Sequence, residues 1–451
     1  MSGLLEGDLR RTVFLLALPV LCEQFLHYLV GLTDTWLSGR ISSAATSAVG
    51  LGAYVGWLAS LFFSLVGTGT TALVARHWGA GEFDAANRVV NRSVALAGLL
   101  GAAFYALLFV LAPLFARLLE MHGDTGQVVV RYLRLDGIGY VFLSVSTVGA
   151  AALRGSGDMR TPMLVLGLVN VVNVAVSTSL VFGLGPIPPI GIDGIVIGTV
   201  VARFGGGLLI LGVLARGSNG LRLIRRELRV RGETVRRILR IGVPAGIEGA
   251  VMWSGHFVFL MIIANLAADG RSSDVFAAHM VGIRVEALTY LPAVAWGAAA
   301  ATLIGQSLGA GRPERAMRGG HEAALQCSAL AVLISIAFYA GARPIYELMH
   351  TDDAVREIGV APFRLLALFQ VPLVWSIVYV FALRGAGDTR FPLVFTLFGT
   401  LLVRLPVAYV CGIVLDGGLF GAWIGMCGDV AVRAVFALVR FSRGRWTGVR
   451  I

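Results

Sequence analysis

Acidic side chains are rare within the long apolar segments of this chain, and Asp34 is one of them. An ionised carboxylate at the centre of a bilayer costs about 2.5–3.5 kcal/mol on insertion scales, so it must find a partner, a proton or a cation. Asp34 lies about four helical turns beyond Pro19. It could bind and release a proton or a sodium ion at a cavity wall, or it could cap the outer end of a helix. We expect reversible ion binding at Asp34.

Two amides and a hydroxyl could assist Asp34. Asn170 and Asn173 are three residues apart, which places them on one face of a helix. Thr199 lies in the next apolar segment. The asparagines could hydrogen-bond to Asp34, and all three residues could take part in ion binding. Alternatively, they make ordinary hydrogen bonds and packing contacts between helices.

Two glutamates occupy equivalent positions, each four residues after a proline. Glu23 follows Pro19, and Glu248 follows Pro244. Proline removes a helical hydrogen bond, so both helices can bend there, and we expect Pro19 and Pro244 to act as hinges. The glutamates could serve secondary ion coupling or gating, or they could pair helices near one membrane face.

The apolar segments also contain arginines. Arg404 has no acidic neighbour along the sequence, so it could pair with Glu248, serve in gating, or extend its guanidinium to the membrane interface. Asp429 and Arg433 are four residues apart and can neutralise each other on one helix face. Arg203 has Thr199 in place of that acid, so its partner must come from another helix.

Aromatic residues in the second half of the chain could line a cavity that accepts cations. Packing or contact with the membrane interface is the alternative for each. The candidates are Trp253, Phe257, Trp296, Trp375 and Tyr379.

These residues must be positioned by helices in a membrane. The chain is 57% hydrophobic and 14% charged, so most of its 451 residues need a lipid solvent. Hydropathy windows of about 19 residues predict an all-α integral membrane protein, and no segment alternates at period two as a transmembrane barrel would. The twelve predicted spans are 12–37, 48–72, 93–116, 133–153, 163–183, 193–214, 238–264, 283–305, 322–342, 363–383, 392–414 and 419–440.

The net charge of +11 comes entirely from arginine, because the chain has no lysine. Most arginines lie in the termini and in alternate loops, which predicts cytoplasmic termini by the positive-inside rule. This arrangement argues against a nucleic-acid partner, and the dense run at 222–240 predicts contact with anionic lipid headgroups. The four cysteines all lie in predicted spans, so we expect neither disulfides nor a metal site.

A ten-residue phrase occurs twice, 230 positions apart, at Leu153–Pro162 and Leu383–Pro392. Each copy joins two apolar segments, so we divide the chain into an N-terminal lobe at 1–216, an arginine-rich cytoplasmic linker at 217–237 and a C-terminal lobe at 238–451. Each lobe would have six spans, so the halves would be related by a pseudo-twofold axis around a central cavity.

The repeated phrase itself resembles a phosphate loop only superficially, since it lacks Gly-Lys-Ser/Thr and a preceding strand. Its glycines permit a tight turn, and Asp158 and Asp388 can accept hydrogen bonds from amides at the start of the next helix. We expect a structural hinge there.

Several stretches resemble the multidrug and toxic compound extrusion (MATE) family. They are Ala17-Leu-Pro19, Gly31-Leu-Thr-Asp-Thr35, both Leu-Arg-Gly-x-Gly-Asp phrases, and Ala278-His279 with Arg284-Val-Glu286 and Gly305-Gln306-Ser-Leu-Gly-Ala-Gly311. The resemblance covers nearly the whole chain in order. It implies a two-lobed secondary transporter that exports bulky, often cationic or amphipathic compounds in exchange for protons or sodium.

The resemblance also distinguishes branches of the family. DinF-like members carry an aspartate four residues after the asparagine of span 5, where this chain has Ser177. NorM-like sodium-coupled members carry acids near the positions of Met252 and Leu373. The chain is therefore more similar to the DinF-like branch, and we expect proton coupling through the first lobe, with sodium as the alternative ion.

We accordingly expect a monomeric exporter in the inner membrane that works by alternating access. Its partners would be small organic substrates, the coupling cation and lipids, and it would need no cofactor. A lipid-linked oligosaccharide flippase is the nearest alternative, although such proteins usually have more spans and more cationic cavities. An integral-membrane transferase would need a cluster of histidines and acids that the sequence lacks.

Overall fold

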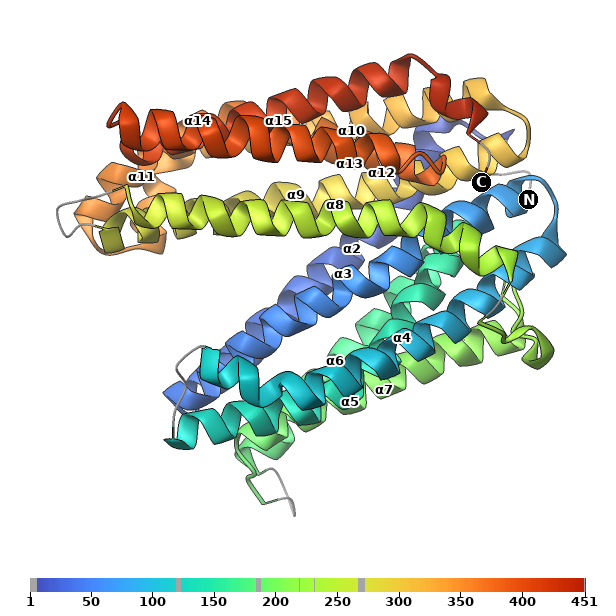
Figure 1. Ribbon diagram of the computed structural model, residues 1–451, viewed down its shortest axis with the longest axis horizontal. Helices are drawn as coiled ribbons and strands as arrows, with labels where there is room; N and C mark the ends of the chain where they lie inside the picture. Colours follow the sequence, from blue (N-terminus) through green and yellow to red (C-terminus); the bar gives the residue numbers. More distant parts are fainter. Residues whose placement is uncertain are drawn as a thin grey trace. The chain divides into compact units, whose positions relative to one another are not determined.

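A computed structural model describes residues 6–118, 123–183, 188–218, 220–230, 232–266, 272–449 and 451 (Figure 1). Helices dominate these residues, and the β-pairing among them is limited to one isolated bridge between Ser218 and Leu221. Positions 219 and 231 of the predicted linker lie outside the described residues. The all-α class predicted from hydropathy is confirmed.

Long helices follow one another with short connections. The first six are α2 (Leu9–Gly39), α3 (Ser43–Gly79), α4 (Phe83–Leu118), α5 (Gly123–Gly155), α6 (Arg160–Phe182) and α7 (Ile192–Arg216). The others are α8 (Glu233–Ala264), α9 (Ser272–Gly309), α10 (Pro313–Met349), α11 (Asp353–Leu368), α12 (Gln370–Gly385), α13 (Arg390–Leu397), α14 (Leu405–Tyr409) and α15 (Gly418–Ser442). Short 3-10 turns lie at Arg225–Glu227 and Arg445–Gly448.

Within the described ranges, eleven helices are long and apolar enough to cross a membrane, and one bent pair makes a twelfth span. The bent pair is α11 and α12, which meet at 52° and correspond to the predicted span 363–383. Counting that pair, the structure agrees with the twelve predicted spans. Many helices extend beyond the predicted ranges, because hydropathy detects only the apolar part of a helix.

The predicted span 392–414 is not a regular α-helix. It consists of α13, a π-helical segment η2 (Phe398–Arg404), the short α14 and a second π-helical segment η3 (Val410–Val414). Pro406 lies between the π segments and has no amide hydrogen to donate to the helical ladder. Segments of π-helix are rare and often occur at functional sites.

Packing divides the chain into two compact units. The first lobe comprises Cys22–Gly242, and the second lobe comprises Met1–Leu21 together with Val243–Ile451. The sequence division followed the repeat, whereas this division falls inside α2 and α8. The start of α2 packs with the second lobe, where Gln326 Nε2 donates to Arg10 O at 2.9 Å. The start of α8 packs with the first lobe, where Arg92 Nη1 donates to Thr234 Oγ1 at 2.8 Å.

Each lobe has its own apolar core. The core of the first lobe includes Leu37, Phe63, Tyr132, Tyr140 and Ile195. The core of the second lobe includes Phe259, Tyr346, Phe363, Trp423 and Met426.

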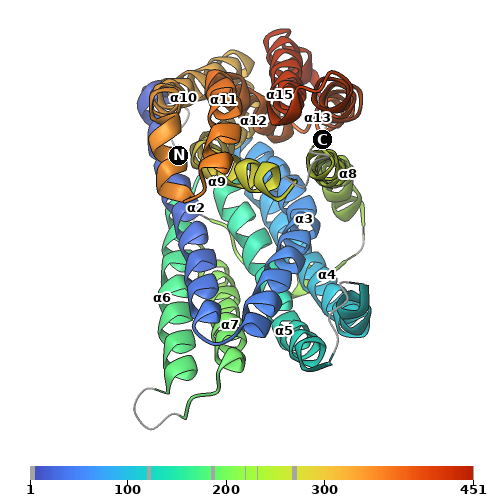
Figure 2. The same cartoon turned by 90° about the vertical axis from the view of Figure 1, so that its left-hand side faces the viewer.

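Gly194 and Gly198 of α7 correspond to Gly421 and Gly425 of α15, and these glycines bring helices close together in both lobes. In the first lobe, α6 and α7 lie side by side (Figure 2). A Cβ on Gly198 would lie 2.8 Å from Ser177 N, and a Cβ on Gly194 would lie 2.8 Å from Leu180 C. The equivalent Gly425 of α15 approaches the backbone of Ala408 in α14. Small residues at this spacing allow close helix contact, so side chains on both helices can meet.

Candidate functional site

Asp34 lies in α2 of the first lobe, one turn from the buried Leu37. Its side chain is partly buried, and its Oδ1 atom is fully buried with no hydrogen-bond partner among the described residues. A buried acceptor without a donor carries a large desolvation cost, so it is a natural place to bind a proton or another cation.

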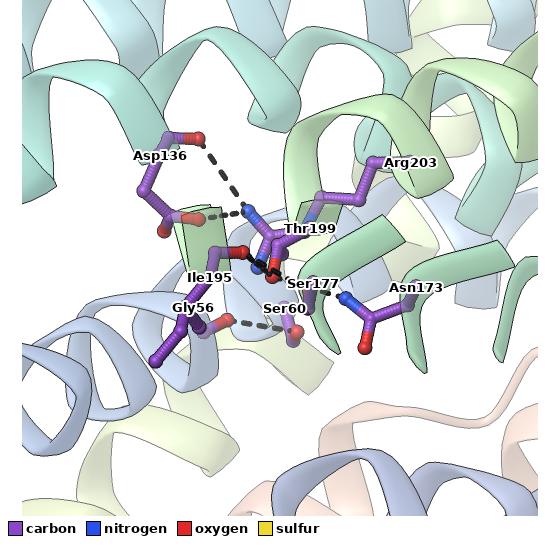
Figure 3. Close-up of polar contacts among 8 residues, drawn as sticks. All are labelled: Gly56, Ser60, Asp136, Asn173, Ser177, Ile195, Thr199 and Arg203. Carbon is purple, nitrogen blue, oxygen red and sulfur yellow. Dashed lines mark hydrogen bonds and ion pairs between the residues drawn. The ribbon is translucent and has the colours of Figure 1, made fainter. Parts of the chain in front are cut away.

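Asn170 and Asn173, which were expected to assist Asp34, lie in α6, and Thr199 lies in α7. Asn170 Nδ2 donates to Leu26 O of α2 at 2.9 Å, which ties α6 to α2. Asn173 Nδ2 donates to Thr199 Oγ1 at 3.1 Å, which ties α6 to α7 (Figure 3). Each amide uses its nitrogen in this way, and each Oδ1 is buried without a hydrogen-bond partner among the described residues. The oxygens of Asp34, Asn170 and Asn173 are therefore buried acceptors that no described group donates to.

Ser177, the position of the family's second aspartate by resemblance, is fully buried one turn further along α6. Its Oγ lies 3.5 Å from Ile195 O, and the backbone of Gly198 lies directly against it. The close approach of α7 leaves little room there for a longer side chain.

Sequence reasoning missed Asp136 of α5. It is 2% exposed and accepts from Arg203 Nη1 of α7 at 2.7 Å (Figure 3). The guanidinium also lies 4.7 Å from the ring centre of Tyr140. The requirement that Arg203 find a partner on another helix is confirmed, and the same requirement was the signal that could have identified Asp136.

The symmetric glutamates make symmetric ion pairs. Glu23 accepts from Arg154 Nη1 at 2.9 Å, and Glu248 accepts from Arg384 Nη2 at 2.8 Å. Both arginines belong to the repeated phrase. Glu248 also accepts from Thr396 Oγ1 at 3.1 Å. The glutamates therefore pair helices, and a role in coupling or gating stays a prediction.

Arg404 pairs with Asp429 at 2.8 Å rather than with Glu248. Asp429 is fully buried and also accepts two hydrogen bonds from Arg433, at 2.8 and 3.0 Å, as the sequence predicted for that pair. Arg433 Nη1 lies 3.8 Å from Met252 Sδ. By resemblance, sodium-coupled relatives carry an acid near this position. This chain has the thioether of Met252 there, and it faces the guanidinium of Arg433.

The family model MatE matches residues 19–178 and 244–410 of the chain. A probable multidrug resistance protein NorM from Thermotoga maritima is 31% identical over 440 residues, covering 97% of this chain and 93% of that protein. The chain belongs to the MATE family. The multidrug resistance protein PmpM from Pseudomonas aeruginosa is 26% identical, over 95% of this chain and 90% of that protein.

The fold of this MATE protein is also that of solved family members. A crystal structure described as a MATE protein in the bent conformation superposes with a TM-score of 0.90 at 21% identity, covering 98% of each chain. At that identity the likeness shows the fold alone. The chain is thus a multi-pass membrane protein with the two-lobed MATE architecture.

The hinge prolines lie near the points where packing changes from one lobe to the other. Pro19 is two residues before Leu21, the last second-lobe residue of α2, and Pro244 is one residue after Val243, the first second-lobe residue of α8. Their role as hinges stays a prediction.

The repeated phrase forms a tight turn in this MATE protein, as predicted. Gly157 and Gly387 both have positive φ, at 92° and 87°. Asp158 Oδ1 accepts from Thr161 N at 3.0 Å, which caps the start of α6. Asp388 instead pairs with Arg440 Nη2 of α15 at 2.8 Å.

The aromatic candidates for a cavity occupy different surroundings. Trp375 Nε1 donates to Ser328 Oγ at 2.8 Å, and Tyr379 is buried 3.0 Å from His321 Nδ1. Trp296 donates to Gln326, whereas Phe257 is 57% exposed and Trp253 is partly buried. Contact with substrate stays a prediction for all five residues.

No group of three histidines, cysteines or acids able to hold a metal ion occurs in the part of the chain that the structure describes.

Proposed function

We propose that this MATE protein is a secondary transporter rather than an enzyme, and that it exports amphipathic or cationic organic compounds in exchange for protons. The buried Oδ1 of Asp34, which has no hydrogen-bond partner among the described residues, carries the proposal. The names of the relatives, multidrug resistance proteins NorM and PmpM, support the substrate class. The protein would be a monomer in the inner membrane with both termini in the cytoplasm.

Asp34 would be the proton-binding group. In its ionised form Asp34 would attract a proton from the outer side. Once protonated, Asp34 would be neutral, and the first lobe would carry one negative charge fewer. Asn170, Asn173 and Thr199 would hold α2, α6 and α7 in register, because their hydrogen bonds join these three helices. A change in the charge of Asp34 would thus affect the packing of α2, α6 and α7 together.

The change in helix packing would drive alternating access. Pro19 and Pro244 would absorb the bending, since each lies near the point where its helix leaves one lobe for the other. The symmetric pairs of Glu23 with Arg154 and Glu248 with Arg384 would keep each lobe intact during the movement.

The choice of proton over sodium rests on the second lobe and on the resemblance. The second-lobe carboxylates Glu248 and Asp429 are each already bound to arginine, and Met252 replaces the acid of sodium-coupled relatives. The NorM name of the Thermotoga maritima relative does not favour a DinF-like branch, so the proposal depends on these residues and not on the branch.

The test compares Asp34→Asn with a matched control, Asp84→Asn, which alters an exposed acid in the first turn of α4. Ethidium efflux would be measured in drug-sensitive cells with and without a proton uncoupler. We expect uncoupler-sensitive efflux for the wild type and for Asp84→Asn, and its loss for Asp34→Asn.

Three results would contradict parts of this proposal. Efflux that follows sodium and ignores the uncoupler would assign sodium as the ion. Gradient-driven efflux by Asp34→Asn would remove Asp34 from the mechanism. Absence of efflux, with lipid-linked sugar accumulating in a deletion strain, would indicate a flippase.

A further inference from the structure

The segment that joins α7 to α8 lies at a membrane face. Both helices are apolar enough to span a bilayer, and α7 ends at Arg216 while α8 begins at Glu233. A helix of 25 residues, the length of α7, rises about 37 Å. A bilayer with its headgroups is about 40–45 Å thick, so residues 217–232, here called the linker segment, begin at the depth of the headgroups.

Two asparagines of α4 hold the linker segment against the first lobe. Asn87 Nδ2 donates to Gly220 O at 3.1 Å, and Asn87 Oδ1 accepts from Arg222 N at 2.6 Å. One turn later, Asn91 Nδ2 donates to Arg222 O at 2.9 Å, and Asn91 Oδ1 accepts from Ile224 N at 2.7 Å. An amide carries both a donor and an acceptor, so each asparagine pairs with the backbone as a neighbouring strand would.

Further contacts fix the linker segment to the helices beside it. Leu223 N donates to Leu214 O of α7 at 3.0 Å. On α4, Arg92 Nη1 donates to Thr234 Oγ1 of α8 at 2.8 Å, and Arg92 Nη2 lies 3.9 Å from Glu227 Oε2. By sequence the linker segment contains five arginines and one acid, which is Glu227. Because that acid faces a cation of α4, the charge presented outward is positive.

Side chains alternate along the docked part of the linker segment. Leu221 is fully buried and Leu223 is partly buried, whereas Arg222 and Ile224 are exposed. Successive side chains of an extended backbone point to opposite faces, so the bonds to α4 also determine which side chains point outward. In the described part of the segment, the exposed large side chains are Arg222, Ile224, Arg225, Arg226, Leu228 and Arg229.

This mixture of cationic and apolar side chains at headgroup depth matches one kind of partner. Guanidinium groups bind phosphate through paired hydrogen bonds. Ile224 and Leu228, at 42% and 41% exposure, can enter the boundary between headgroups and acyl chains as interfacial segments do. An acidic soluble protein would satisfy the arginines but would have no access to apolar side chains at that depth.

We propose that the docked linker segment is a binding surface for anionic phospholipid headgroups, prearranged by Asn87 and Asn91. The segment is thus a fixed part of the first lobe that contacts the adjoining leaflet, and not only a tether between the lobes. The proposal does not depend on the role of Asp34, and its test requires no transport.

The test measures lipid binding to the full-length protein. Purified protein in detergent would be titrated with phosphatidylglycerol, which is anionic, and with phosphatidylcholine, which is zwitterionic. Native mass spectrometry would count the bound lipids and give a Kd for each. We expect tighter binding of phosphatidylglycerol, weakened by salt. Inorganic phosphate at the same concentration should not displace it, since free phosphate lacks the acyl chains.

Removal of two exposed arginines should weaken this binding. One arginine near an anionic lipid surface contributes about fivefold in affinity, so Arg225→Gln with Arg226→Gln should bind phosphatidylglycerol about 25-fold more weakly. The matched control is Arg343→Gln with Arg364→Gln, which removes two exposed arginines from the second lobe. That control should bind phosphatidylglycerol as the wild type does. Equal Kd values in the two double variants, or equal binding of both lipids by the wild type, would overturn the proposal.

Asn87→Ala tests the prearrangement separately. It keeps every arginine and removes the bonds to Gly220 and Arg222, so phosphatidylglycerol binding should weaken by less than in the linker double variant. The thermal transition would establish that each variant is folded. If Asn87→Ala does not fold, Arg225→Gln with Arg226→Gln decides alone, because it alters only exposed side chains. An unchanged Kd in folded Asn87→Ala would refute the part of the proposal that assigns prearrangement to α4.

Discussion

Arg154 donates to both carboxylate oxygens of Glu23, at 2.9 and 3.1 Å, from within a phrase that recurs 230 residues later. In the second copy, Arg384 Nη2 donates to one carboxylate oxygen of Glu248 at 2.8 Å, and Thr396 Oγ1 donates to the other at 3.1 Å. Each pair joins the proline-containing helix of a lobe to the helix that ends in the repeated phrase. The duplication thus preserved a contact between helices as well as a turn.

Removing one partner of this pair should destabilise the first lobe. Glu23→Gln leaves Arg154 without its carboxylate, and because Arg154 is 20% exposed we expect a cost of about 1–3 kcal/mol, below that of a fully buried pair. The measurement is the thermal transition of the protein in detergent. The double variant with Arg154→Gln should recover part of the loss, and a double variant as unstable as the sum of both singles would contradict pairing.

Gly198 should tolerate no side chain. A Cβ there would lie 2.8 Å from Ser177 N, so Gly198→Ala must push α6 and α7 apart, at a cost of about 1–3 kcal/mol. Gly205→Ala on the same helix is the control, because nothing lies within 4 Å of its Cβ. We expect lower thermal stability and lower efflux for Gly198→Ala only. Equal behaviour of the two variants would show that the close approach is unimportant.

Asp429, Arg404 and Arg433 form a buried ion-pair cluster, and replacing different members should destabilise the protein by different amounts. Asp429→Asn leaves two buried guanidiniums without their anion, and we expect a cost of about 3–5 kcal/mol. Arg404→Gln leaves Asp429 with both bonds from Arg433, so its cost should be about 1–3 kcal/mol. Detergent-solubilised yield and thermal transition measure both. The opposite ranking would mean that Arg404 is the main partner of Asp429.

The membrane class and the spans were predictable because the hydropathy of a span depends only on its own consecutive residues. The tight turn of the repeated phrase was also predictable, because Gly157 and Gly387 occupy backbone conformations that favour glycine. The bend between α11 and α12 was not predicted, because a break of one residue at Phe369 leaves the hydropathy of the span unchanged.

Pairing across helices was the least predictable part of the site. Sequence spacing identified Asp429 with Arg433, which share a helix, but it offered Glu248 as the partner of Arg404. It required an unnamed partner for Arg203 and did not find Asp136. Contacts of this kind depend on helix rotation and depth, which small residues such as Gly198 set through packing.

The hydrogen bond between Asn173 and Thr199 offers a quantitative test of how α6 and α7 are coupled. Its length of 3.1 Å and its burial predict a favourable interaction, and such bonds in membrane proteins average about 0.6 kcal/mol with a maximum near 1.7 kcal/mol. A cycle of Asn173→Ala, Thr199→Val and the double variant would isolate this energy from thermal stability. Ser60→Ala in α3, whose hydroxyl donates to Gly56 O of the same helix at 2.9 Å, provides the control. We expect coupling for the pair and additivity between Ser60→Ala and Asn173→Ala; additivity within the pair would mean that the bond contributes nothing to helix association.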